Sequence, residues 1–165
     1  YSKLRERLLA DEQVLEWTGP KKSAGLDPKK LPGIVIDDVD AKLIGEWAHS
    51  ASINGFVGVD YLHDNNTAKG DCRVEFTAKL PKPGRYDVRI AYPPNPNRAT
   101  NVPITVTSAD GDKTVKLNQR EATQEGFRSI GLFRFDDANP ARVIISNANT
   151  DGHVIVDAVQ FSHQP

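Results

Sequence analysis

Hydrophobic positions near the start of the chain recur with the period of an α-helix. Leu4, Leu8 and Leu15 return to one helical face, charged residues are interspersed between them, and Ser2 can cap the first turn. This pattern predicts a helix over residues 2–17. The pair Gly19-Pro20 ends the predicted helix.

A connector follows the predicted helix. It carries several lysines and prolines, which is the composition of an exposed linking segment. We therefore divide the chain into an N-terminal helix with its connector, residues 1–32, and a main domain, residues 33–165. With 165 residues and 38% hydrophobic content, the chain is long enough for one well-buried core and short for two.

In the main domain the helical period gives way to short alternating or β-branched runs, separated by Gly, Pro, Asn and Asp. No segment between them has the pattern of a crossover helix, so the strands must pair mostly antiparallel, with two sheets packed face to face. The fold class is therefore all-β, an antiparallel β-sandwich. The predicted strands are 34–38, 56–61, 72–80, 85–92, 102–108, 113–118, 128–135, 142–146 and 153–161.

Two of these runs alternate cleanly enough to predict the core. One face of each is apolar, and we expect these side chains to be mostly buried: Val74, Phe76, Ala78, Leu80, Tyr86, Val88, Ile90 and Tyr92. The segment Ala109-Asp110-Gly111-Asp112 between two runs predicts a tight hairpin, because Asp-Gly favours the positive backbone angles of such turns.

Composition and charge exclude several classes of protein. The net charge of −1 lacks the basic character that nucleic-acid binding requires, so nucleic acid is not expected as a partner. No apolar run approaches the roughly 20 residues that span a bilayer. The single cysteine, Cys72, cannot form an internal disulfide and is interpreted as a small hydrophobic residue. The chain starts at Tyr1 and contains no methionine, which indicates a mature product or a fragment of a longer protein.

Catalytic motifs do not emerge from the sequence. It contains no G-x-S-x-G, H-E-x-x-H, C-x-x-C or phosphate-binding glycine loop, and its histidines lack metal-ligand spacing. His63 with Asp64 is the one local pair that could provide acid/base chemistry. We therefore expect a domain that is not itself an enzyme, although a longer parent protein can be one.

One carboxylate of the last run requires a partner. Gln160 and Ser162 are expected to point outward, which places Asp157 on the core face. An unpaired buried carboxylate is costly, so an arginine, backbone N–H groups or a cation must compensate it. If the first and last strands are neighbours, Asp37, Asp38 and Asp157 can form a structural calcium site. No other cofactor is expected.

Two polar segments carry groups suited to sugar binding, residues 60–70 and 95–101. An aromatic face, a guanidinium, an imidazole and several amides together can hold hydroxyls and the apolar face of a sugar ring. The same residue types also build ordinary turns. The candidate ligand-binding residues are Tyr61, His63, Asp64, Asn97, Arg98 and Asn101, together with Trp47 as a stacking platform or core residue and Asn118 beside the hairpin.

The order of several short motifs resembles that of a known family. The motifs are Val-Ile-Asp-Asp, Gly-Glu-Trp, Gly-Val-Asp-Tyr, Pro-Gly-Arg-Tyr-Asp-Val, Asn-Arg-Ala-Thr-Asn-Val-Pro, Ile-Gly-Leu-Phe and Val-Asp-Ala-Val-Gln-Phe, between residues 34 and 161. They resemble the golvesin and xanthan-lyase carbohydrate-binding-like domain. The resemblance implies a jelly-roll-like sandwich that serves as a C-terminal accessory domain of large bacterial proteins, secreted or at the periplasm or cell surface, including FAD-dependent oxidoreductases.

Two functions follow as alternatives. The first is a non-catalytic carbohydrate-binding module that recognises a polysaccharide. The second is a structural or interaction domain that stabilises an upstream domain of the same polypeptide without a glycan ligand.

Overall fold

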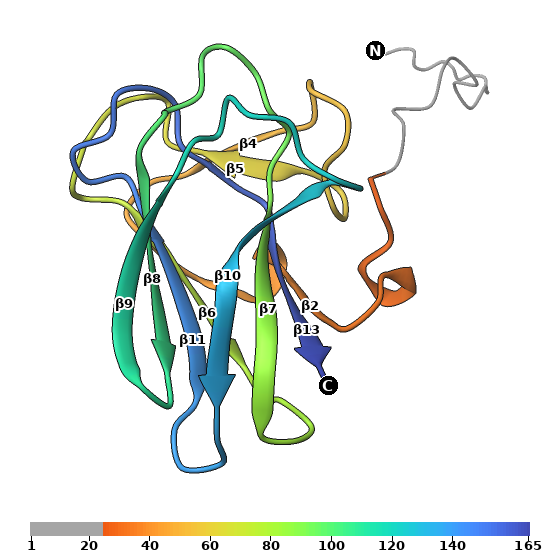
Figure 1. The fold of residues 1–165 in the computed structure, drawn as a ribbon. Coiled ribbons are helices and arrows are strands. Elements are labelled where there is room, and N and C mark those ends of the chain that lie inside the picture. Colours follow the sequence, from red (N-terminus) through yellow and green to blue (C-terminus); the bar gives the residue numbers. More distant parts are fainter. Residues whose placement is uncertain (1–24) are drawn as a thin grey trace.

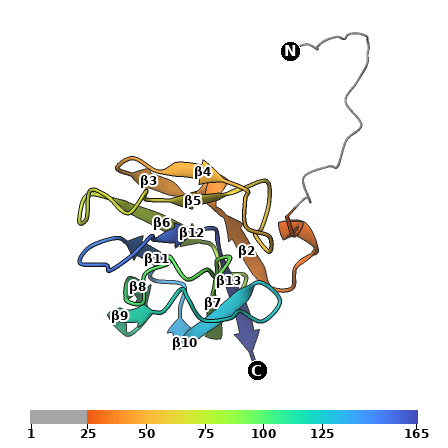
Figure 2. The same ribbon diagram turned by 90° about the horizontal axis from the view of Figure 1, so that it is seen from above.

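The computed structural model describes residues 25–165, and the helix predicted over residues 2–17 lies outside this range. Two antiparallel sheets face each other, and a small third sheet lies across one end of the sandwich (Figures 1 and 2). The strand orders are β10-β7-β13-β2, β3-β6-β11-β8-β9 and β12-β5-β4. The all-β antiparallel sandwich predicted from the sequence is therefore confirmed.

The strands are short, as their spacing in the sequence suggests. They are β2 (Ile34–Asp37), β3 (Lys42–Ile44), β4 (Ala48–Ser50), β5 (Tyr61–His63), β6 (Arg73–Ala78), β7 (Gly84–Ala91), β8 (Val102–Ser108), β9 (Gly111–Leu117), β10 (Phe127–Phe135), β11 (Ala141–Ser146), β12 (Ile155–Val156) and β13 (Ala158–Gln164). Two 3-10 turns, η1 (Pro28–Lys30) and η2 (Asp38–Asp40), flank β2. None of the helices within residues 25–165 has the length and apolar character needed to cross a membrane.

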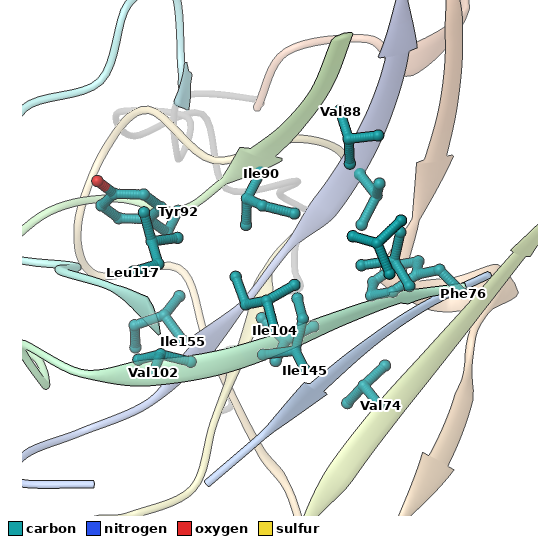
Figure 3. Close-up of a cluster of buried hydrophobic side chains, with 14 of the residues drawn as sticks. Val74, Phe76, Val88, Ile90, Tyr92, Val102, Ile104, Leu117, Ile145 and Ile155 are labelled. Carbon is teal, nitrogen blue, oxygen red and sulfur yellow. The ribbon is translucent and has the colours of Figure 1, made fainter. Parts of the chain in front are cut away.

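The core lies between the two large sheets, where alternating side chains of both meet. Figure 3 shows Val88 and Ile90 of β7 opposite Ile104 of β8 and Ile145 of β11. Seven of the eight predicted core residues are buried, and Leu80, beyond the end of β6, is partly buried against the same cluster. The hairpin is also confirmed, since Ser108 pairs with Gly111 in the β8–β9 ladder.

Three short strands differ from the prediction, β5, β3 and β4. The run 56–61 is not a strand over its whole length, because Gly58 has a φ of 75° and interrupts the extended backbone, so β5 begins only at Tyr61. The short strands β3 and β4 were not predicted, because three residues are too few to establish an alternating pattern.

The last predicted strand is divided at Asp157. β12 pairs with β5 in the small sheet, whereas β13 pairs with β2 and β7 in a large sheet, so the chain changes sheets at this residue. Gln160 points away from the core, as expected, because its neighbours Val159 and Phe161 face the core, but the residue is only 2% exposed. Gln160 donates to the Pro32 carbonyl at 2.8 Å, and Arg89 donates to its Oε1 at 3.1 Å. The end of the connector therefore covers this outer face.

Candidate functional site

A hollow of about 190 Å³ opens beside the small sheet, and polar residues from four segments line it. We call it the Arg98 hollow. The four segments are β4 with the residues after it, β5, the β7–β8 connection, and the two residues before β12. The lining residues are Ser50, Ser52, Ile53, Tyr61, His63, Asn95, Asn97, Arg98 and His153. Pockets that enclose a drug-sized ligand measure about 300–1,000 Å³, so this hollow is suited to one sugar ring or one charged substituent.

Backbone hydrogen bonds join the segments that form the hollow. The Ala99 N–H donates to the His153 carbonyl at 2.8 Å, and the His153 N–H donates to the Asn97 carbonyl at 3.0 Å. In the small sheet Ile155 pairs with His63, which fixes the other wall. Residues that are distant in the sequence are thus held side by side by the main chain.

Arg98 is the most unusual residue of the hollow. It is only 4% exposed, its Nε donates to the Pro93 carbonyl at 3.1 Å, and its Nη1 donates to Asn97 Oδ1 at 2.9 Å. Its Nη2 is buried and has no acceptor within hydrogen-bond geometry, although the Tyr61 hydroxyl lies close enough to interact with the guanidinium. Within residues 25–165 no carboxylate forms an ion pair with it. Because buried polar groups are nearly always satisfied, this nitrogen is a candidate ligand donor.

The Tyr61 ring lies beneath this cation, with its centroid 5.6 Å from the Arg98 Cζ. Burial alone raises the pKa of the Tyr61 hydroxyl, but the hydroxyls of Ser50 and Ser52 and the nearby Arg98 outweigh this effect and lower it. Tyr61 therefore offers the hollow a strong hydroxyl donor and an aromatic ring.

Two histidines complete the lining, His63 and His153, with ring centroids 6.2 Å apart. Burial lowers the pKa of His63, and the neighbouring His153 and Arg98 lower it further. His63 is therefore neutral at pH 7, where it can accept as well as donate a hydrogen bond. No Asp or Glu lines the hollow.

Four of the predicted binding residues, Tyr61, His63, Asn97 and Arg98, meet in this hollow. Asp64 does not line it. Its carboxylate is buried and accepts hydrogen bonds from Asn66 N, Val154 N, Lys69 and Asn147. Burial alone would raise the pKa of Asp64, but these donors hold it below its usual value. Asp64 thus supports the segment that carries His153.

The other predicted binding residues also lie outside the Arg98 hollow. Asn101 exchanges hydrogen bonds with the 149–151 loop, donating to the Asn149 carbonyl and accepting from Asp151 N. The Trp47 Nε1 donates to the Ile44 carbonyl, and the ring packs against the core. Asn118 Oδ1 accepts from Arg120 N in a turn.

Sequence reasoning missed Ser50, Ser52, Ile53 and His153 as lining residues, whereas Asn95 stands in the predicted polar segment 95–101 but was not singled out. Ser50 and Ser52 belong to a strand and loop that had no recognisable pattern. The position of His153 depends on the pairing of β12 with β5, which no local signal reveals.

The candidate calcium ligands Asp37, Asp38 and Asp157 also come together. One carboxylate oxygen of each lies within 4.8 Å of the other two, and all three residues are buried. The condition on which this prediction rested is met, because β2 and β13 are neighbours.

The Golvesin C-terminal domain family matches the chain over residues 34–163. The chain belongs to this family. Xanthan lyase from Bacillus sp. (strain GL1) is 32% identical to it over 151 residues, which are 87% of this chain and 16% of that protein. The resemblance inferred from the motifs is therefore confirmed, and the golvesin domain spans only a small part of this relative's length.

Solved structures support the same assignment. A Paenibacillus xanthan lyase superimposes with a TM-score of 0.75 at 32% identity, over 79% of this chain and 13% of that one. A family 35 carbohydrate-binding module from Clostridium thermocellum superimposes with a TM-score of 0.55 at 16% identity, over 78% of this chain and 97% of the module. At that identity the module shows that the fold is shared. The golvesin domain thus has the fold of a carbohydrate-binding module.

Proposed function

We propose that this domain is a non-catalytic module that binds an acidic polysaccharide, and that the Arg98 hollow receives a carboxylate-bearing sugar. The observation that carries the proposal is the buried Arg98 guanidinium, whose Nη2 has no acceptor within hydrogen-bond geometry. A guanidinium matches a carboxylate in shape and charge and can bind it through two parallel hydrogen bonds. A ligand carboxylate would provide the missing acceptor.

The rest of the lining favours the same ligand class. The hollow contains the Arg98 cation and no carboxylate, so its electrostatic potential favours an anion. Hydroxyl and amide groups of Ser50, Ser52, Tyr61 and Asn97 are suited to the remaining sugar oxygens. Because the hollow holds about one sugar, the rest of the polysaccharide would extend over the surface beside β4 and β5.

The relatives suggest a first ligand and a setting. Two of them are xanthan lyases, so we choose xanthan, an acidic polysaccharide, for the test. A module that binds an extracellular polysaccharide works outside the cytoplasm, as an appendage of a larger exported protein. Its share of the xanthan lyase chain, 16%, is consistent with such an appendage.

Affinity electrophoresis of the 165-residue chain tests the proposal. Gels containing xanthan should retard the protein, whereas gels containing carboxyl-reduced xanthan or a neutral glucan should not. Arg98→Gln should abolish the retardation, and Arg134→Gln, which changes a solvent-exposed arginine of β10, should keep it. Equal retardation of wild type and Arg98→Gln would contradict the assigned site. Absence of binding to any acidic polysaccharide would favour a purely structural domain.

A further inference from the structure

Three buried carboxylates lie together at the end of β2. At the same place the chain passes from β12 in the small sheet to β13 in a large sheet. Asp37 ends β2, Asp38 begins η2, and Asp157 separates β12 from β13. Their side chains are 7%, 3% and 0% exposed, and one oxygen of each lies within 4.8 Å of the others. Aspartates are rarely buried unless they are paired, so this grouping requires a compensating group.

The hydrogen bonds of the cluster leave two oxygens unsatisfied. Asp157 Oδ2 accepts from the Val57 N–H at 2.8 Å, and Asp37 Oδ1 accepts from the Asp38 N–H at 2.9 Å. Asp157 Oδ1 and Asp38 Oδ2 are both buried without any partner. Two unsatisfied oxygens in one place are unusual for a native protein.

The charges around the cluster make its burial still less favourable. The charged groups that act on Asp157 are Asp38, Asp37 and Asp60, all negative. Within residues 25–165 no lysine or arginine forms an ion pair with any of the three. Three like charges that are close together, buried and, among the described residues, without a neighbouring cation require a compensating positive charge.

Protonation alone does not resolve this arrangement. A protonated carboxyl needs an acceptor for its O–H, and no hydrogen bond joins the three carboxyl groups to one another. A cation, in contrast, neutralises the charge and coordinates both unsatisfied oxygens at once.

We infer that Asp37, Asp38 and Asp157 bind a divalent cation, and that the cation is calcium. All available donors are oxygens, which hard cations prefer. Calcium–oxygen distances of about 2.3–2.6 Å allow one ion to bridge oxygens up to about 5 Å apart, which matches this cluster. Magnesium keeps several of its waters and demands a near-ideal octahedron, so a buried set of carboxylates suits it less well.

The cation has a structural consequence for the segment that leads into β5. The Val57 N–H is bonded to Asp157, and Gly58 lies so close to Asp37 that an added Cβ would be 2.3 Å from its Oδ2. Calcium therefore ties β2, the β12–β13 junction and residues 57–58 together. Tyr61 follows three residues after Gly58, so the same ion stabilises one wall of the Arg98 hollow.

Thermal unfolding of the chelator-treated 165-residue chain tests the inference. Added calcium should raise the melting temperature by roughly 5–10 °C at a hundredfold excess over its dissociation constant. Calorimetric titration should show one ion per chain, and magnesium should give a smaller shift. No shift and no heat with calcium would overturn the inference, and an equal shift with magnesium would overturn the choice of ion.

Variants locate the site. Asp157→Asn and Asp38→Asn should remove the calcium-induced shift, while Asp137→Asn, an exposed carboxylate between β10 and β11, should keep it. If Asp157→Asn does not fold, the wild-type titration and Asp38→Asn still decide. A full calcium shift in Asp38→Asn would place the ion elsewhere and overturn the assignment.

Discussion

Asp64 stabilises the loops behind the Arg98 hollow, and the effect of replacing it can be estimated from its contacts. Its Oδ1 accepts from Asn66 N at 2.9 Å and Val154 N at 3.0 Å, and its Oδ2 accepts from Lys69 Nζ at 2.9 Å and Asn147 Nδ2 at 3.0 Å. In Asp64→Asn an NH2 group replaces one of these acceptors. In either orientation of the new amide, two hydrogen bonds are therefore lost. The NH2 group then faces the two donors that the replaced oxygen accepted from.

Each hydrogen bond to a charged group contributes about 1.5–3 kcal/mol, so the loss of two should lower the unfolding free energy of the variant by about 3–6 kcal/mol. Urea unfolding at neutral pH measures this loss, with Asp71→Asn, an exposed carboxylate on the same connection, as the control that leaves stability unchanged. A loss below about 1 kcal/mol would refute the reasoning.

The pH dependence of this loss has a defined sign. The pKa of Asp64 in the folded protein is below its usual value of 3.8, so its contribution is complete above that pH and disappears as the pH falls through the folded value. The difference in stability between wild type and Asp64→Asn should therefore narrow on acidification below about pH 4. A difference that stays constant to pH 2 would show that the carboxylate charge is not responsible.

Two further predictions concern buried polar side chains. Gln119 exchanges hydrogen bonds of 2.8 Å with both the N–H and the carbonyl of Ile155. Gln119→Ala should therefore lower the unfolding free energy, measured in urea, by about 2–4 kcal/mol. An unchanged urea midpoint would contradict this role. Burial raises the pKa of Tyr92 to about 12, so wild type should lose stability as the pH rises from about 10 to 12. Tyr92→Phe should lack that loss. If wild type and Tyr92→Phe lost stability equally at alkaline pH, the ionisation of Tyr92 would not be the cause.

The sequence was sufficient to predict the layers and the core but not the junctions between sheets. Val74, Val88 and Ile90 lie in regular alternation, which reports burial directly. Gln160 follows the same alternation, yet it is buried because the end of the connector packs over it, and local patterns carry no information about such distant coverage. The break at Asp157 was missed for a similar reason, because the change of sheet depends on pairing with β5.

The candidate site shows the same limit. Tyr61, His63, Asn97 and Arg98 were identifiable from their chemistry because they stand in two unusually polar segments. His153 was not, because it stands as a lone histidine in the sequence and reaches the hollow through its bridge with Arg98 and through the pairing of β12 with β5. Asp64 has the same chemistry as a ligand-binding carboxylate, and only its four donors reveal a structural role.

Binding of an acidic oligosaccharide and of its carboxyl-reduced form, measured by calorimetry on the same protein sample, tests the central claim most directly. The account predicts that the acidic form binds, that reduction of its carboxylates abolishes binding, and that Arg98→Gln loses the acidic ligand while remaining folded. Equal affinity for the acidic and the reduced forms would contradict the assignment of the Arg98 hollow as a carboxylate site.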